Sequence, residues 1–165
     1  MAEAYITVAD AQIYFQSKLQ TAAWDRATFD QQQKSLYEAT RIIDALKLTG
    51  SKADRDQVLR FPRMHQLAED TDPLSPTFGE LIPTVPNDVK EACCDIAIAL
   101  LQGVDPTHEY NLLSRQVHGY ATTRQQKDTS MVEPHIAAGV PSLDAWKKLV
   151  KYLRDYQGFS LVRDS

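Results

Sequence analysis

The sequence predicts a mainly α-helical fold: a small bundle of about four main helices with long loops, a short β-hairpin and an extended C-terminal tail. Apolar residues recur at spacings of three and four in four separate segments, and residues that begin helices precede these segments. The chain has 165 residues, of which 43% are hydrophobic and 24% charged. A chain of this length and composition buries roughly two thirds of its unfolded surface, which argues against disorder.

The first two expected helices are short. Thr7 and Asp10 form a capping pair that predicts a helix over residues 8–19. Its apolar face comprises Val8, Ala11, Phe15 and Leu19, widened by Ile13 and Tyr14. A second helical piece over 22–27 carries Trp24, which we expect to fill the core with one large ring.

The longest expected helix spans residues 29–46. Thr28 and Gln31 repeat the capping pattern at its start, and Gly50 stops it. After it, no helical period persists between residues 51 and 85. We expect 59–63 to be extended, because a residue before proline is disfavoured in the helical region, and 69–86 to be a proline-rich surface loop.

A third long helix is expected over residues 87–102 and is apolar nearly all round, which places it at the centre of the bundle. Beyond it we expect a helical turn over 110–113, a hairpin formed by 115–117 and 120–123, and a polar exposed arm over 125–139. The last helix is expected over 143–156, followed by a tail that alternates like a strand. We expect one domain, with a helical core at 1–111, a hairpin and arm at 112–141, and a C-terminal helix and tail at 142–165.

Residue patterns typical of catalysis are missing from the sequence. The four histidines are scattered over loops, the six glycines stand singly, and no serine lies in a nucleophile turn. Cys93 and Cys94 are adjacent and are expected to be free, buried thiols. We therefore expect no enzyme, no cofactor and no metal site. No apolar run is long enough to span a membrane and the start lacks a secretion signal, so we also expect no membrane association.

Charge is unevenly distributed along the chain, whose net charge is −4. Residues 1–111 hold 10 basic and 17 acidic residues, whereas residues 112–165 hold 8 basic and 5 acidic residues. One short stretch of the sequence contains three cations, two of which flank a histidine and a tyrosine: Arg115, His118, Tyr120, Arg124 and Lys127. Such a segment allows weak single-stranded DNA binding, which uses cations and aromatic rings, or contact with an acidic neighbour, which we favour.

Several short blocks, in a fixed order over about residues 4–102, resemble one family of bacteriophage and prophage proteins. The blocks comprise residues 4–11, 14–15, 23–27, 36–44, 50–52, 59–63, 82–83 and 89–92. Proteins with this pattern are often labelled DnaT-like single-stranded DNA-binding proteins, and they resemble the head-tail connector, or adaptor, proteins of tailed phages. Residues 104–141 match no block of the pattern.

The resemblance implies a structural virion protein of the phage neck, present in the host cytoplasm during assembly. Its copies are expected to form a ring of about twelve beneath the portal. The ring would contact the portal and a tail, tail-terminator or nozzle protein, and double-stranded DNA would pass through it without specific binding. The alternative is a DnaT-like single-stranded DNA-binding module in phage replication.

Two sets of residues are candidates for the contacts of such a protein. Contacts to the portal or a neighbouring subunit are expected from Arg115, Tyr120, Arg124, Lys127, Phe159, Leu161, Val162 and Arg163. A structural motif is expected from Trp24, Phe61, Pro62 and Arg63. Within this motif, Phe61 enters the core and Arg63 pairs with an acid of the bundle, or the block contacts another subunit. The tail either docks through its apolar residues or is a frayed end.

Overall fold

The structure is a computed structural model that describes residues 3–108, 110 and 133–154. It confirms a mainly α-helical fold with long loops and a small two-stranded antiparallel sheet. The elements in chain order are α1 (Val8–Gln16), α2 (Ala22–Arg26), α3 (Phe29–Ala45), β1 (Leu67–Glu69), β2 (Leu81–Pro83), α4 (Asn87–Leu101), α6 (Pro134–Ala137), α7 (Leu143–Leu149) and the 3₁₀ turn η1 (Val150–Tyr152).

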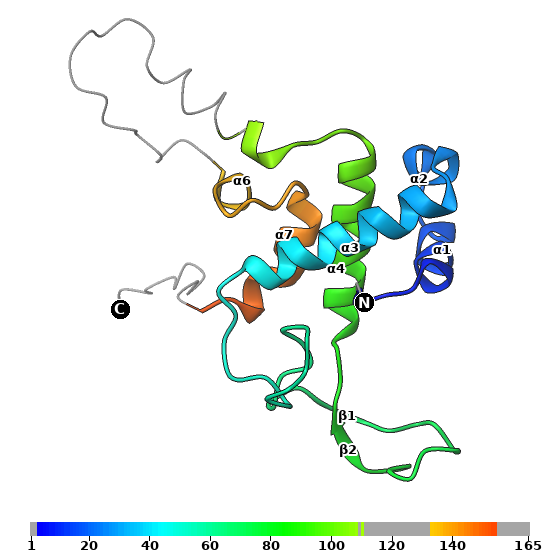
Figure 1. Ribbon diagram of the computed structural model, residues 1–165, viewed down its shortest axis with the longest axis vertical. Coiled ribbons are helices and arrows are strands. Elements are labelled where there is room, and N and C mark those ends of the chain that lie inside the picture. Colours follow the sequence, from blue (N-terminus) through cyan, green and yellow to red (C-terminus); the bar gives the residue numbers. More distant parts are fainter. Residues whose placement is uncertain (1–2, 109, 111–132, 155–165) are drawn as a thin grey trace, which may run out of the picture.

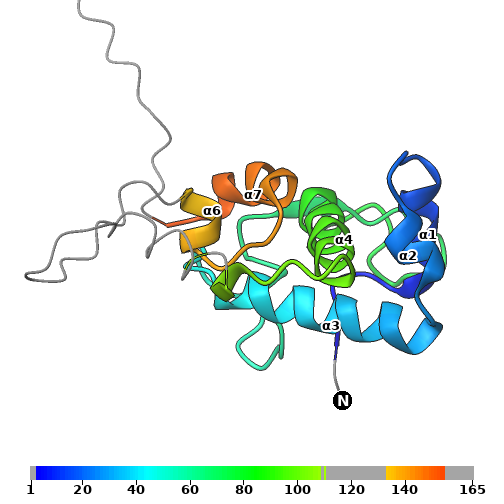
Figure 2. The ribbon, with the colours of Figure 1, turned by 90° about the horizontal axis from the view of Figure 1, so that it is seen from above.

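Helix α4 lies at the centre of the bundle, as its apolar sequence predicts. It crosses α3 on one side, lies beside α7 on another, and meets α1 and α2 at its far edge (Figure 2). Both thiols of α4 are buried and free, as expected for Cys93 and Cys94. Because water reaches so little of this helix, its apolar side chains supply the largest share of the buried core.

Helix α1 is shorter than the sequence predicts. The Thr7 hydroxyl accepts a hydrogen bond from the Asp10 N–H at 3.2 Å and caps its start. The helix ends at Gln16, where the Ser17 and Lys18 N–H groups bond to carbonyls three residues back. Leu19 therefore lies beyond the helix and is exposed, and Ile13 also points to solvent. The expectation that Leu19 belongs to the apolar face is wrong, because the helix ends before it. The expectation that Ile13 widens the face is also wrong, because this side chain is exposed within the helix.

Trp24 and the start of α3 fold as predicted. The Trp24 ring is fully buried, lies 4.6 Å from the Phe15 ring between centroids, and donates its indole N–H to the Gln12 side chain at 2.8 Å. Thr28 and Gln31 form a reciprocal capping box at the start of α3. The box satisfies two N–H groups that a helix start otherwise leaves without a partner.

Strands β1 and β2 form a hairpin where the sequence predicts only a surface loop. Leu67 pairs with Pro83, Ala68 with Ile82 and Glu69 with Leu81. The hairpin projects away from the helices, at the lower end of the view in Figure 1. Each strand has three residues and the segment contains prolines, so neither length nor alternation distinguishes it from a loop in the sequence.

The C-terminal segment differs from expectation in two ways. Residues 134–137 form helix α6 with Ile136 buried, so this part of the expected exposed arm in fact packs on the body. Helix α7 begins at its Ser142 cap as predicted but ends at Leu149, where η1 follows. The hairpin expected at 115–123, the turn at 111–113 and the tail strand at 159–163 lie outside the described residues.

Candidate functional site

The contact residues expected from the sequence are divided between the two parts of the chain. Outside the described residues lie Arg115, Tyr120, Arg124, Lys127, Phe159, Leu161, Val162 and Arg163. The structure does describe the expected structural motif of Trp24, Phe61, Pro62 and Arg63.

Phe61 joins three distant parts of the chain. Its ring lies between those of Tyr5 and Tyr152, with centroids 5.7 Å away on each side in edge-to-face geometry. The Tyr5 hydroxyl accepts the Phe61 N–H at 3.2 Å and donates to the Asp44 carboxylate. Burial and the neighbouring Asp44 raise the pKa of Tyr5. This packing fixes the loop after α3 against the N-terminal segment and η1.

Among the described residues no acid pairs with Arg63, contrary to the expectation that it binds an acid of the bundle. Its buried guanidinium donates to backbone carbonyls, to Thr49 at 2.8 Å, to Arg60 at 3.3 Å, and to Gly50 and Leu48. Burial lowers the pKa of Arg63. The fork geometry of the guanidinium suits a turn whose carbonyls converge on one point. Arg63 therefore organises the turn at 48–50 and is not free to bind a phosphate.

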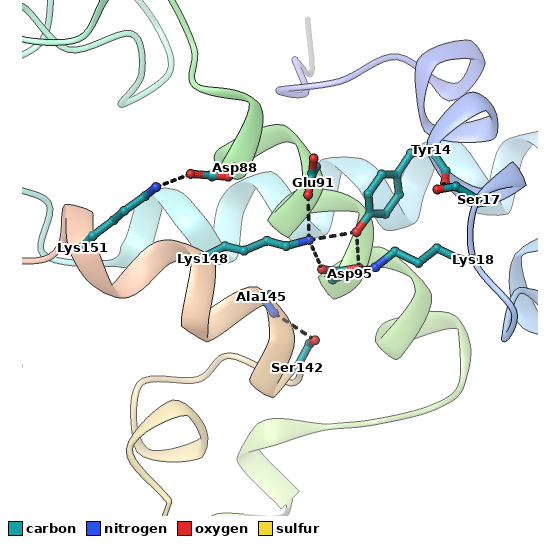
Figure 3. A network of polar contacts seen from close by, with 10 residues as sticks. All are labelled: Tyr14, Ser17, Lys18, Asp88, Glu91, Asp95, Ser142, Ala145, Lys148 and Lys151. Carbon is teal, nitrogen blue, oxygen red and sulfur yellow. Dashed lines mark hydrogen bonds and ion pairs between the residues drawn. The ribbon is translucent and has the colours of Figure 1, made fainter.

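A polar network ties α1, α4 and α7 together (Figure 3). The Lys148 ammonium lies 2.7 Å from Asp95, 3.0 Å from Glu91 and 2.8 Å from the Tyr14 hydroxyl. Tyr14 in turn donates to the second Asp95 oxygen at 2.8 Å. Burial by itself lowers the pKa of Lys148, but the hydrogen bonds to Asp95, Tyr14 and Glu91 outweigh it and raise the pKa.

Two neighbouring lysines, Lys18 and Lys151, also pair with carboxylates of α4. Lys18 lies 3.8 Å from Asp95, and Lys151 donates to Asp88 at the start of α4 (Figure 3). Lysines bind DNA by neutralising phosphates, so a lysine already paired with a carboxylate gains less from that exchange. The lysines on this side of the bundle thus hold helices together.

The hairpin presents acids and apolar side chains to solvent. Residues 66–85 contain four acids and no Lys, Arg or His. One acid, Asp70, organises the 70–80 loop, because it accepts the Thr77 hydroxyl at 2.6 Å and the Asp72 N–H at 3.1 Å. Hydrogen bonds from Ser75, Thr77 and that N–H lower the pKa of Asp70. The other three acids are exposed.

The preceding loop carries the opposite charge. Residues 47–65 contain five Lys and Arg against two Asp, a net charge of +3 with His65 neutral. Arg63 is buried, but Lys47, Arg55 and Arg60 are exposed. Val58 and Met64 add exposed apolar side chains to the same loop. A basic loop and an acidic hairpin therefore follow one another directly in the chain.

Metal binding and membrane insertion find no support in the described part of the chain. Its His, Cys, Asp and Glu residues do not gather into a group that could hold a metal ion. None of the helices described is long and apolar enough to cross a membrane. The exposed features that stand out are the acidic and apolar hairpin and the basic 47–65 loop.

A family profile described as "Putative DnaT-like ssDNA binding protein" matches residues 1–162. The chain belongs to this family. The match includes residues 104–141, which the sequence blocks did not cover. The family description agrees with the single-stranded DNA-binding alternative and does not bear on a connector role. No curated protein and no solved structure matches the chain.

Two features of the described surface were missed by the sequence reasoning. The network around Lys148 had one signal, because Asp95 is the single acid in the otherwise apolar stretch 92–101. A lone acid in a buried helix requires a charged or polar partner. The only sequence feature that set the hairpin apart was its charge: residues 47–65 hold five Lys and Arg, whereas residues 66–85 hold four acids and no base.

Proposed function

We propose that this protein is a structural component of the phage neck, a head-tail connector that forms a ring of about twelve copies beneath the portal. Resemblance to connector proteins in the sequence blocks of residues 4–102 suggests this role. The observation that carries the proposal is the described surface, where Lys148 and Lys151 pair with acids of α4 while the hairpin exposes acidic and apolar side chains.

A connector has to let DNA pass without holding it. Phosphates are repelled by acidic walls and attracted by free cations. Lys148 and Lys151 are engaged by Asp95 and Asp88, and the hairpin adds exposed acids without a single base. These two surfaces favour contact with proteins over a tight grip on a nucleic acid, whereas the 47–65 loop exposes Lys47, Arg55 and Arg60. The ring, its portal and tail partners and its place in the virion neck are all part of this proposal.

Single-stranded DNA binding is the second candidate, and the family description favours it. Strand binding combines a cationic track with aromatic rings that stack on bases, each worth about 1 to 3 kcal/mol. Arg115, Arg124, Lys127 and Tyr120 supply these residue types in one short segment. In this reading the helical body holds that segment in place and takes little part in binding.

Size-exclusion chromatography with light scattering, with and without purified portal, tests the first candidate. A connector forms a ring-sized complex with portal and leaves single-stranded DNA unshifted in a gel at about 150 mM salt. A protein that stays apart from portal and shifts single-stranded DNA at that salt overturns the connector proposal in favour of the second candidate.

Two variants, one in the 115–127 segment and one on α3, show which residues cause any DNA shift. Replacing Arg115, Arg124 and Lys127 by alanine abolishes the shift if that segment is the binding track. Replacing Lys34 and Arg41, exposed cations that pair with acids on α3, removes charge from the body instead. A shift lost in both variants indicates a general charge effect and contradicts a specific track.

A further inference from the structure

The exposed face of the hairpin carries large apolar side chains on a projecting element. Leu74 is 93% exposed and Phe78 is 59% exposed, and Leu67 and Leu81 are also exposed on the two strands. A projecting hairpin has little of its own chain to pack these side chains against (Figure 1). Several large apolar side chains exposed to water on one projecting element favour contact with another protein.

The acids beside these side chains narrow the choice of partner. Glu69, Asp72 and Glu80 are exposed, and no base lies within residues 66–85 to offset them. The matching surface should be basic with some apolar content. Residues 47–65 have this composition, with Lys47 and Arg55 exposed next to Val58, which is 70% exposed, and Met64.

Within the part of the chain that the structure describes, no ion pair joins the acids of the hairpin to the bases of the 47–65 loop. The base of the hairpin is fixed by the Thr84 N–H, which donates to the Gln66 carbonyl at 3.0 Å, and by the pairing of β1 with β2. The loop is fixed in turn by Arg63 and by the bridge between Lys52 and Arg63. The exposed side chains of the hairpin and of the loop are therefore open to a second copy.

We propose that the hairpin of one copy docks on the basic 47–65 loop of the next copy. The contact joins two different surfaces of the same chain, so it is head-to-tail, and repeating it produces a ring or a filament. Opposite charges bring the surfaces together and set their orientation, while Leu74 and Phe78 supply the apolar contact. Closure of the contacts into a ring rests on the proposed connector function. The contact between two copies does not, because it forms without portal.

Paired charge reversals test the contact. The hairpin variant carries Glu69→Lys and Glu80→Lys, which leave Asp70 and Asp72 to organise the loop. The loop variant carries Lys47→Glu and Arg55→Glu. The control carries Asp30→Lys and Glu38→Lys on α3, which changes the net charge as the hairpin variant does. Sedimentation velocity of the free protein up to about 1 mM measures association, and circular dichroism checks the fold.

Wild type and control are expected to associate with rising concentration, and more weakly at high salt. Each reversed variant alone is expected to associate about tenfold more weakly. An equimolar mixture of the two variants should regain association, because the unchanged acidic hairpin of the loop variant then meets the unchanged basic loop of the hairpin variant.

Three results overturn the docking proposal. In the first, the wild-type protein stays monomeric up to about 1 mM. In the second, the reversed variants associate as strongly as wild type. In the third, the mixture of the two variants does not regain association. The last result, with folded variants, indicates edge-to-edge pairing of two hairpins instead. Failure here is distinct from failure of the connector proposal, because portal-driven ring formation is measured separately with wild-type protein.

Discussion

Replacing Lys148 by methionine tests whether the polar network stabilises the bundle. Methionine keeps most of the lysine stem but removes the ammonium that joins α7 to Asp95, Glu91 and Tyr14. The Asp95 side chain is only 10% exposed, so its carboxylate loses a charge-assisted hydrogen bond without gaining full hydration.

The expected loss can be worked out from the contacts that remain. Removing one partner of a fully buried ion pair costs about 3 to 5 kcal/mol. Asp95 keeps the Tyr14 hydroxyl at 2.8 Å and Lys18 at 3.8 Å, and the Lys148 side chain is itself 23% exposed. We therefore expect the free energy of unfolding to fall by about 2 kcal/mol. For a chain of this size the melting temperature then drops by roughly 4 to 8 °C.

Urea unfolding followed by tryptophan fluorescence measures this change, since Trp24 and Trp146 are both buried. The matched control is Lys34→Met. Lys34 lies 2.6 Å from Asp30, closer than Lys148 to Asp95, but both side chains of that pair are about 70% exposed. An exposed pair contributes at most about 0.5 kcal/mol on a helix. Equal losses in the two variants would refute the argument that burial decides the strength of the pair.

Three further predictions concern the loop after α3 and the thiols. Arg63→Lys should lower the free energy of unfolding by about 2 kcal/mol in urea titrations, because an ammonium cannot reach all the carbonyls of the turn. The control is Arg60→Lys at an exposed position, which should change the free energy of unfolding by under about 0.5 kcal/mol. Gly50→Ala should lower the melting temperature measurably, since the backbone at φ +73° disfavours any side chain; an unchanged value would contradict this. Burial raises the pKa of Cys93 from 9.0 to about 11 and also raises the pKa of Cys94. Above about pH 9 the unfolded chain therefore releases thiol protons that the folded protein keeps. The free energy of unfolding should fall as the pH rises through this range. Urea titrations from pH 7 to 10.5 measure that fall, which should be smaller in Cys93→Ala than in wild type.

Sequence reasoning predicted well where a pattern repeats within one element. The apolar spacing and capping box of α3 and the all-round apolar character of α4 each depend on neighbours three or four residues away. Leu19 shows the limit of this reasoning. It continues the spacing of α1, but the helix stops at Gln16 because the next N–H groups bond to nearer carbonyls.

Contacts between distant residues could not be predicted in the same way. The expectation that Arg63 binds an acid was chemically reasonable, since charge pairs are the usual partners of a buried guanidinium. The structure brings the carbonyls of residues 48–50 and 60 around it instead. Likewise, only folding brings Tyr14, Asp95 and Lys148 together, although their positions in the chain are far apart.

By itself the sequence determined the helical class of this protein, the central place of α4 and the separation of bases at 47–65 from acids at 66–85. These properties depend on composition and short-range spacing, which are written directly in the chain. Only the tertiary structure decided that the acidic segment is a projecting hairpin and that the lysines of α7 face carboxylates. Both features depend on which surfaces meet after the chain has folded. A charged side chain interacts most strongly with the groups within a few ångströms of it, and only folding decides which groups those are.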